Sequence, residues 1–294
     1  MPPLRILETP ELHEPTLIAA FAGWSDAGGA ATSAAQYLAE RWRAPRIAEI
    51  EAEGFYDFTQ LRPTVRYVDE TRRRIDWPEN FFSVHQTPER DLIILNGIEP
   101  HLHWKTYVDS VLDVIQRFDV KLVVTLGALF VEYPHTRPMR ITGTAPDPEM
   151  QERAGLFQRG GRYEGPTGIS GVLNVALRDR EVPAATIWAN VPHYVSASPN
   201  PRATLGLLRS LTSMLEVEVP LRRMERASEA FDTQLNEATE KNSEVSEYVR
   251  SLEERIDAEL DGTSGDGPQA ELPATDTIVK DIEDFLRGSS REEP

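Results

Sequence analysis

The sequence predicts an α/β protein with three layers, in which helices cover both faces of a mainly parallel sheet. Predominantly apolar runs lie at 16–22, 92–95, 122–126 and 184–191. Such runs are typical of parallel strands that are buried on both faces. Helical segments separate them, as crossover connections in a parallel sheet require. The chain has 294 residues, of which 40% are apolar, which is enough for one large core and an appendage.

In the N-terminal half, a strand at 16–22 is followed by an alanine-rich helix at 30–43, which Ser25 or Asp26 is placed to cap. The alternating segment 47–53 predicts a second strand. The segment 65–77 predicts a hairpin, whose basic run 72–74 we assign to its solvated edge. Further strands are expected at 81–84 and 92–95. Apolar residues at helical spacing then predict a helix over 104–118.

In the central part, we expect the strand 122–126 to end at Gly127. The loop that follows carries Pro134 and Pro138, which restrict φ and stiffen it. A strand is predicted at 140–143 and a short helix within 146–161. Glycines at 165–171 lead into a helix that ends at Arg180. The last buried strand, 184–191, is followed by a helix at 202–215.

The composition changes after Pro220. We therefore predict a core domain at 1–220 and an acidic helical extension at 221–294, with a linker at 261–273 and a final helix at 275–286. The extension contains 20 acidic and 9 basic residues. Apolar residues recur in steps of four and three between Phe231 and Ile256, interrupted by Asn242. This seam predicts either one long helix that packs on a partner subunit or two helices that break near Asn242 and fold back.

The composition also argues against several classes of protein. The chain has no cysteine, which excludes disulfides, thiolate metal sites and a cysteine nucleophile and fits a cytoplasmic protein. No apolar run is long enough to span a membrane, and the first residues lack the pattern of a secretory signal. The formal charge of −17 repels phosphate backbones, so we do not expect a nucleic-acid partner.

Polar or aromatic side chains follow four of the predicted strands. Carboxyl ends of parallel strands share one edge of a sheet, where ligands commonly bind. We therefore predict one ligand cleft, formed by Trp24, Ser25, Asp26, Glu99, His135, Arg137, His193 and Tyr194. An arginine beside a histidine can hold an anion, and a Glu–His pair can move a proton.

Each of these residues also has a structural interpretation. Asp26 is placed as a helix cap, and Glu99 can accept hydrogen bonds from backbone donors of the next loop. His135 and Arg137 can form an internal network, and His193 and Tyr194 can pack in the core. No nucleophile elbow, P-loop or metal-binding motif is present, so we assign no catalytic residue, metal site or cofactor.

Several short motifs occur in a fixed order: GWSDAG at 23–28, GIEP at 97–100, PHTRP at 134–138, GPTG at 165–168 and VPHY at 191–194. Over roughly residues 15–260 the chain resembles the proteasome assembly chaperone two (PAC2) family, in its actinobacterial branch. The resemblance implies an α/β/α fold similar to purine nucleoside phosphorylases, and homo-oligomers, with a trimer favoured. Eukaryotic members help to assemble the proteasome α ring, and archaeal members engage proteasomes through a hydrophobic–Tyr–any tail. This sequence ends in REEP, so we do not expect direct docking on proteasome pockets.

Two functional hypotheses follow. The first is a non-enzymatic, cytoplasmic, homo-oligomeric protein of the proteasome-assembly-chaperone type, whose client is a protein that the sequence does not identify. The alternative is a small-molecule enzyme or binding protein of the nucleoside phosphorylase or hydrolase type, which would use the cleft at the strand ends.

Overall fold

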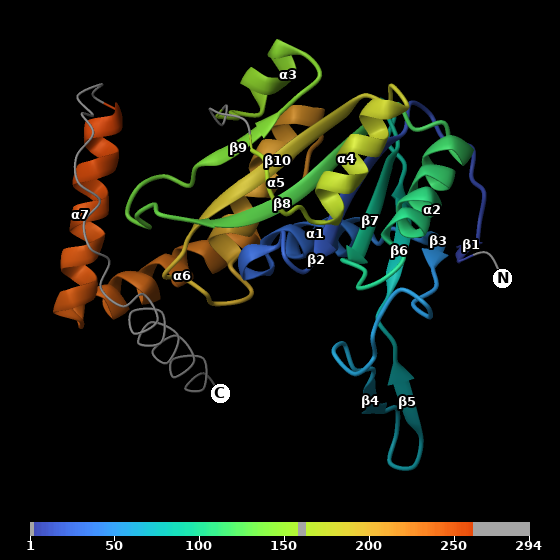
Figure 1. Cartoon of the computed structure of the whole chain (residues 1–294), viewed down its shortest axis with the longest axis horizontal. Helices are drawn as coiled ribbons and strands as arrows, with labels where there is room; N and C mark the ends of the chain where they lie inside the picture. The colour runs from blue at the N-terminus through green and yellow to red at the C-terminus, as the bar shows by residue number, and fades with distance from the viewer. Residues whose placement is uncertain (1–2, 158–162, 261–294) are drawn as a thin grey trace.

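The structure is a computed structural model, which describes residues 3–157 and 163–260. It contains a large twisted sheet, a projecting hairpin and a pair of C-terminal helices (Figure 1). The predicted linker at 261–273 and helix at 275–286 lie outside the described residues. None of the described helices is both long enough and apolar enough to cross a membrane.

The main sheet has eight strands in the order β1-β3-β6-β7-β2-β8-β10-β9. Its four central strands, β7, β2, β8 and β10, are parallel, and the flanking strands pair antiparallel. The predicted α/β class is therefore confirmed. The strands are β1 (Leu4–Ile6), β2 (Thr16–Ala22), β3 (Arg46–Ile50), β6 (Asn80–His85), β7 (Leu92–Ile98), β8 (Leu122–Val131), β9 (Ile141–Thr144) and β10 (Ala184–Pro192).

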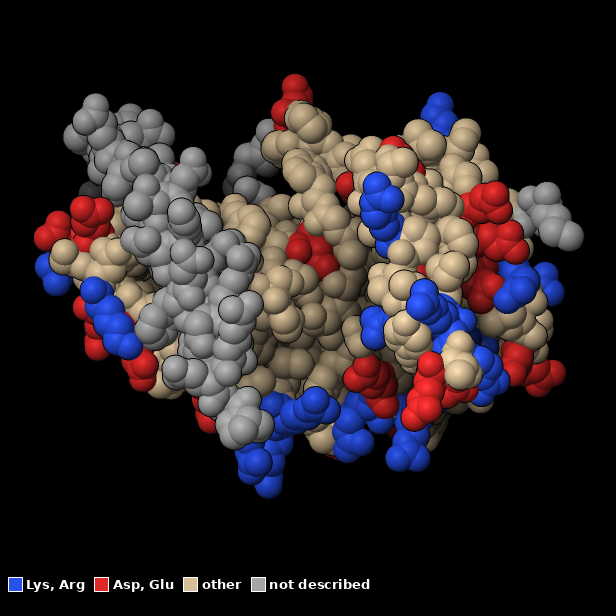
Figure 2. Space-filling model, turned by 90° about the horizontal axis from the view of Figure 1, so that it is seen from below, with Lys and Arg blue, Asp and Glu red and all other residues tan. Residues whose placement is uncertain are grey.

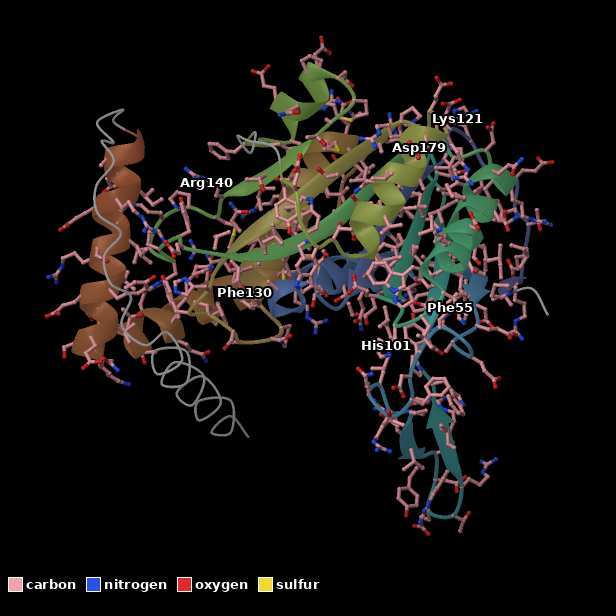
Figure 3. The ribbon with its side chains drawn as sticks, viewed as in Figure 1. Phe55, His101, Lys121, Phe130, Arg140 and Asp179 are labelled. Carbon is pink, nitrogen blue, oxygen red and sulfur yellow. The ribbon has the colours of Figure 1, made fainter. Side chains whose placement is uncertain are left out.

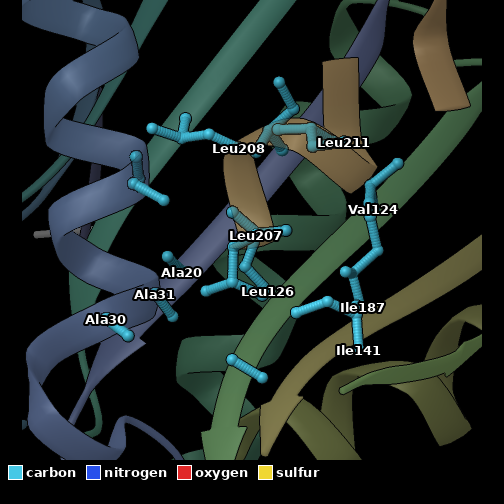
Figure 4. Close-up of a cluster of buried hydrophobic side chains, with 14 of the residues drawn as sticks. Ala20, Ala30, Ala31, Val124, Leu126, Ile141, Ile187, Leu207, Leu208 and Leu211 are labelled. Carbon is cyan, nitrogen blue, oxygen red and sulfur yellow. The ribbon is translucent and has the colours of Figure 1, made fainter. Parts of the chain in front are cut away.

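Helices cover both faces of the sheet, as predicted (Figure 1). Helices α1 (Ala30–Trp42) and α5 (Pro201–Leu215) lie on one face, and α2 (Trp104–Arg117) and α4 (Ile169–Asp179) lie on the other. Figure 4 shows the first of the two cores, where small residues of α1 such as Ala30 and Ala31 lie near Leu126 of the sheet and Leu207 of α5. Alanine keeps the helix–sheet distance short, and the leucines of α5 fill the remaining space.

Two strand ends differ from the prediction. Gly127 does not end its strand, because β8 continues to Val131 and pairs with β10 as far as Pro192. A Cβ atom at Gly127 would lie 2.3 Å from the Trp188 ring, so the glycine makes room for this neighbouring side chain rather than a turn. Similarly, β7 continues to Ile98 instead of ending at Leu95, which leaves Glu99 as the first residue beyond it.

The predicted hairpin is present as β4 (Thr64–Tyr67) and β5 (Arg73–Asp76), and it projects from the body of the molecule (Figure 1). The two strands form a separate two-stranded sheet. Their apolar side chains, including Val65 and Ile75, are more than half exposed. A short helix, α3 (Pro148–Arg153), follows β9, and a 3₁₀ turn (Ala27–Gly29) precedes α1.

The apolar seam between Phe231 and Ile256 forms two helices, α6 (Arg222–Glu240) and α7 (Ser243–Leu260). The Asn242 side chain accepts hydrogen bonds from the backbone N–H groups of Glu244 and Val245, at 3.0 and 3.2 Å, and so caps α7. The apolar residues of both helices pack on Tyr194 and Val195 of the same chain. The second of the two predicted arrangements, two helices that fold back, is therefore the one observed.

Candidate functional site

The eight predicted site residues lie in two groups rather than around one cleft. Trp24, Ser25, Asp26 and Glu99 lie where β2 and β7 end, close to the start of α4. His135, Arg137, His193 and Tyr194 lie beneath α6 and α7. The prediction of a single cleft was wrong in this respect.

The separation results from the unexpected length of β8 and β10. Asp26 forms a bridge with Ala128, so the β2 loop lies beside this point of β8. The strand then continues through Val131, three residues further, which is about 10 Å at ~3.3 Å per residue. In Figure 3, Phe130 lies near this distal end of β8, while Lys121 and Asp179 lie at the opposite end of the sheet. The His135 loop therefore starts well beyond the ends of β2 and β7.

Asp26 caps the first helix. Its Oδ1 atom accepts a hydrogen bond from the Ala31 N–H at 2.7 Å, and its Oδ2 atom accepts one from the Thr32 hydroxyl at 2.5 Å. Burial raises the pKa of the Asp26 carboxyl, although the hydrogen bonds from Thr32 and Ala31 act in the opposite direction. The carboxylate thus occupies the N-terminus of α1, where an anionic ligand would otherwise bind.

Glu99 does the same for α4. Its Oε2 atom accepts a hydrogen bond from the N–H of Ile169, the first residue of that helix, at 2.8 Å. A Cβ atom on Gly168 would lie 2.5 Å from the Ser25 hydroxyl and 2.7 Å from the Glu99 carboxylate, so only glycine allows this approach. Ser25 is buried, whereas Trp24 beside it is 60% exposed. Two helix N-termini at this edge are therefore capped by carboxylates of the chain itself.

In the second group, the buried Tyr194 hydroxyl bonds twice to His135. It accepts a hydrogen bond from the His135 backbone N–H at 2.7 Å and lies 2.8 Å from Nδ1. The hydroxyl therefore donates to Nδ1, which assigns the imidazole proton to Nε2, 3.2 Å from the Asn236 side-chain oxygen. Burial and the nearby Arg202 guanidinium lower the pKa of His135 to about 4, so the ring is neutral at pH 7.

Arg137 is held by α7. Its guanidinium donates to both carboxylate oxygens of Asp257, at 3.0 and 2.6 Å, and to Glu253 at 3.1 Å. The Arg137 hydrogen bonds lower the pKa of the Asp257 carboxyl. Arg202 on α5 donates to the backbone carbonyls of His135 and Arg137 and so fixes the loop between them. The fork predicted to bind an anion is thus paired within the chain.

His193 completes this group. Its Nε2 lies 3.2 Å from the Tyr248 hydroxyl on α7, and its Nδ1 lies 3.3 Å from the Val131 carbonyl. The Tyr248 ring also packs edge-on against Tyr194 and His193. These contacts make the second group a polar and aromatic interface between the sheet and the C-terminal helices.

Sequence reasoning missed the partners of this second group, which are Arg202, Asn236, Tyr248, Glu253 and Asp257. Glu253 and Asp257 have the i, i+4 spacing that places two carboxylates on one helix face. That spacing was visible in the sequence, but nothing local links it to an arginine 120 residues away.

One face of the molecule is hollowed near its middle (Figure 2). Figure 2 shows that uncharged side chains line most of the hollow and that an acidic side chain lies at its centre. Within residues 3–157 and 163–260, no group of three or more histidine or acidic side chains is arranged to hold a metal ion. Where β2 and β7 end, the charged groups of the first group are the carboxylates of Asp26 and Glu99.

Comparison with known proteins places these observations in context. A family model described as the PAC2 family matches residues 20–239. A PAC2 family protein from Streptomyces avermitilis is 41% identical, with 80% of this chain and 99% of that chain covered and a TM-score of 0.72. A proteasome-assembly chaperone homologue from Mycobacterium tuberculosis is 43% identical over the same shares, with a TM-score of 0.71. A Corynebacterium glutamicum protein of unknown function is 30% identical, with 89% of this chain and 99% of that chain covered and a TM-score of 0.81. No curated protein matches.

Proposed function

The chain belongs to the PAC2 family, and we propose that it is a non-enzymatic, oligomeric protein of the proteasome-assembly-chaperone type that acts on a protein client in the cytoplasm. The Mycobacterium tuberculosis relative is described as a proteasome-assembly chaperone homologue, which supports this class of function. It also makes proteasome subunits the first clients to test.

One observation carries the proposal: the charged groups predicted to bind a ligand are already paired inside the chain. Asp26 and Glu99 cap α1 and α4, and Arg137 forms ion pairs with Glu253 and Asp257. A phosphate at either helix N-terminus would have to displace a carboxylate of the same sign. An enzyme that binds phosphate or a nucleoside keeps such groups available for its substrate. This pairing therefore favours a protein that binds another protein rather than a small molecule.

The alternative is a small-molecule enzyme or binding protein of the nucleoside phosphorylase or hydrolase type. The observation in its favour is Trp24, an exposed aromatic ring beside the buried Ser25 and close to Gly168 at the start of α4. Such a ring can stack on a flat ligand. This alternative predicts binding in the first group, between Trp24 and Glu99.

A thermal-shift screen separates the two. A nucleoside or sugar phosphate with a Kd of about 1 μM, at a hundredfold excess over that Kd, would stabilise the protein by about 2.7 kcal/mol. We expect no such shift from the full chain. A shift that disappears in Trp24→Ala but not in the control variant Trp42→Phe, which lies at the end of α1 opposite to the one that Asp26 caps, would overturn the proposal and establish the alternative.

Partner binding is tested directly with proteasome subunits from the same organism. Light scattering is expected to give an oligomer at micromolar concentration, with a trimer favoured, and size-exclusion chromatography is expected to show co-elution with free α subunits but not with assembled particles. A monomer, or equal binding of free and assembled subunits, would contradict an assembly role.

A further inference from the structure

A further cavity lies at the base of the hairpin and shares no residue with the two groups described above. A cavity of about 490 Å³ opens between β3, β6 and the segment that joins β5 to β6. Its volume falls within the range of about 300–1,000 Å³ that is common for ligand sites. Phe55 and His101, labelled in Figure 3, mark the loops at the base of the hairpin near this region.

Aromatic rings form part of the cavity wall. Phe58 and Trp77 contact each other edge to face, with ring centroids 5.0 Å apart. Trp77 is 52% exposed, so much of its ring remains available for contact. Arg46 and Phe81 also line the cavity. The Arg46 guanidinium lies 3.9 Å from the centre of the Phe81 ring and forms an ion pair with Glu79 at 2.6 Å. The chain therefore already places one guanidinium between an aromatic ring and a carboxylate in this cavity.

The cavity carries an excess of negative charge. Four glutamates line it against one arginine: Glu49, Glu51, Glu53 and Glu79. Glu49 is paired with Arg5, and Glu79 is paired with Arg46. Glu51 and Glu53 form no side-chain hydrogen bond or ion pair with any other residue that the structure describes. Two unpaired carboxylates beside exposed aromatic rings attract a cation and repel an anion.

We propose that this cavity binds an arginine or lysine side chain from a basic peptide segment of a partner protein. The aliphatic stem of such a side chain packs against Phe58 and Trp77, while its charged head meets Glu51 and Glu53. A peptide, rather than a free amine, fits the surroundings of the cavity. β5 ends at Asp76, directly before Trp77, and its outer edge has no partner strand among the described residues, so an extended peptide can pair along it.

The site is tested by calorimetry with the full chain and a short capped peptide of alternating valine and arginine. The control peptide carries citrulline, which is neutral and nearly isosteric, in place of arginine. We expect the arginine peptide to bind at least about tenfold more tightly than the citrulline peptide. The same affinity for both peptides would overturn the proposal.

Variants locate the binding. The double substitution Glu51→Gln with Glu53→Gln is expected to weaken the affinity about tenfold. The matched control, Glu247→Gln with Glu254→Gln on the exposed face of α7, removes the same charge and is expected to change the affinity less than about twofold. Both pairs are exposed, so neither should unfold the protein. An equal effect of both pairs would show only general electrostatic attraction and refute the site.

Calorimetry with free arginine amide and with putrescine tests whether the ligand is a peptide or a small organic cation. They carry the cationic group without a peptide backbone, so we expect them to bind at least about tenfold more weakly than the peptide. If either binds as tightly, the ligand is a small organic cation and the assignment to a peptide is wrong. This outcome is independent of the proposed function, whose thermal-shift screen concerns Trp24 and the strand ends.

Discussion

Leu235→Ala is expected to weaken the docking of the C-terminal helices on the core while the α/β/α core keeps its stability. Leu235 lies on α6, is 1% exposed, and packs in a small cluster with Tyr194 and with Val245 and Leu252 of α7. This cluster is distinct from the two larger ones that flank the sheet. A cavity in it therefore weakens the docking of α6 and α7 more than it weakens the sheet.

The magnitude follows from the size of the truncation. Replacing a fully buried leucine by alanine removes three carbon atoms, which is about 2.4 kcal/mol at ~0.8 kcal/mol per carbon. The cavity left behind adds a further contribution, within the range of about 2–5 kcal/mol seen for such substitutions. We therefore expect the free energy of opening α6 and α7 to fall by about 3 kcal/mol.

Hydrogen exchange measured by mass spectrometry tests this. A loss of about 3 kcal/mol corresponds to a roughly hundredfold faster exchange of the amides in α6 and α7. Amides of β2 and β8 should keep their protection. The matched control is Leu207→Ala on α5, a fully buried leucine of the main core, which should lower the protection of both regions.

Two results would refute this reasoning. If Leu235→Ala accelerates exchange equally in β2 and in α6, the core and the helices unfold as one cooperative unit. If it accelerates exchange in neither, Leu235 does not hold α6 and α7 on the core.

Three further predictions concern the same interface. The pKa of His135 is about 4 in the folded state and near 6.5 in the unfolded state, so the unfolded state takes up a proton first as the pH falls. The contribution of His135 to the free energy of unfolding is therefore complete above pH 6.5 and is lost as the pH falls toward 4. Chemical denaturation at pH 7 and 4.5 should show the wild type losing about 2 kcal/mol more than His135→Asn. Arg137→Ala should increase proteolysis of α7, with a larger effect at low salt, and Arg137→Lys should restore protection only in part because lysine cannot form the bidentate pair; an effect independent of salt would contradict the role of the ion pairs. Truncation after Pro220 should expose Tyr194 and Val195 and produce aggregates in light scattering; a soluble truncated protein with unchanged assembly would place the subunit interface in the α/β domain.

The fold class was predictable because its signals are local. Each buried parallel strand is a short run of aliphatic residues, and each helix has its own apolar stripe, so both can be recognised within a few residues. The cap function of Asp26 was also visible, because a carboxylate immediately before an alanine-rich segment is a local pattern. The lengths of β7 and β8 were not, because Gly127 resembles a strand end unless the Trp188 ring on the neighbouring strand is known.

The sequence by itself thus determined the layers of the molecule, the hairpin and the presence of a C-terminal helical extension. Only the tertiary structure decided what the polar strand-end residues do. From the sequence, Arg137 is a candidate anion-binding group, but in the structure it pairs with Asp257, 120 residues away. The apolar seam that begins at Phe231 is compatible with a subunit contact, but in the structure it packs on Tyr194 of the same chain. The physical reason is that hydrophobic periodicity can be recognised within one short segment. The partner of a buried charge or of an apolar seam depends instead on how segments distant in the sequence pack against each other.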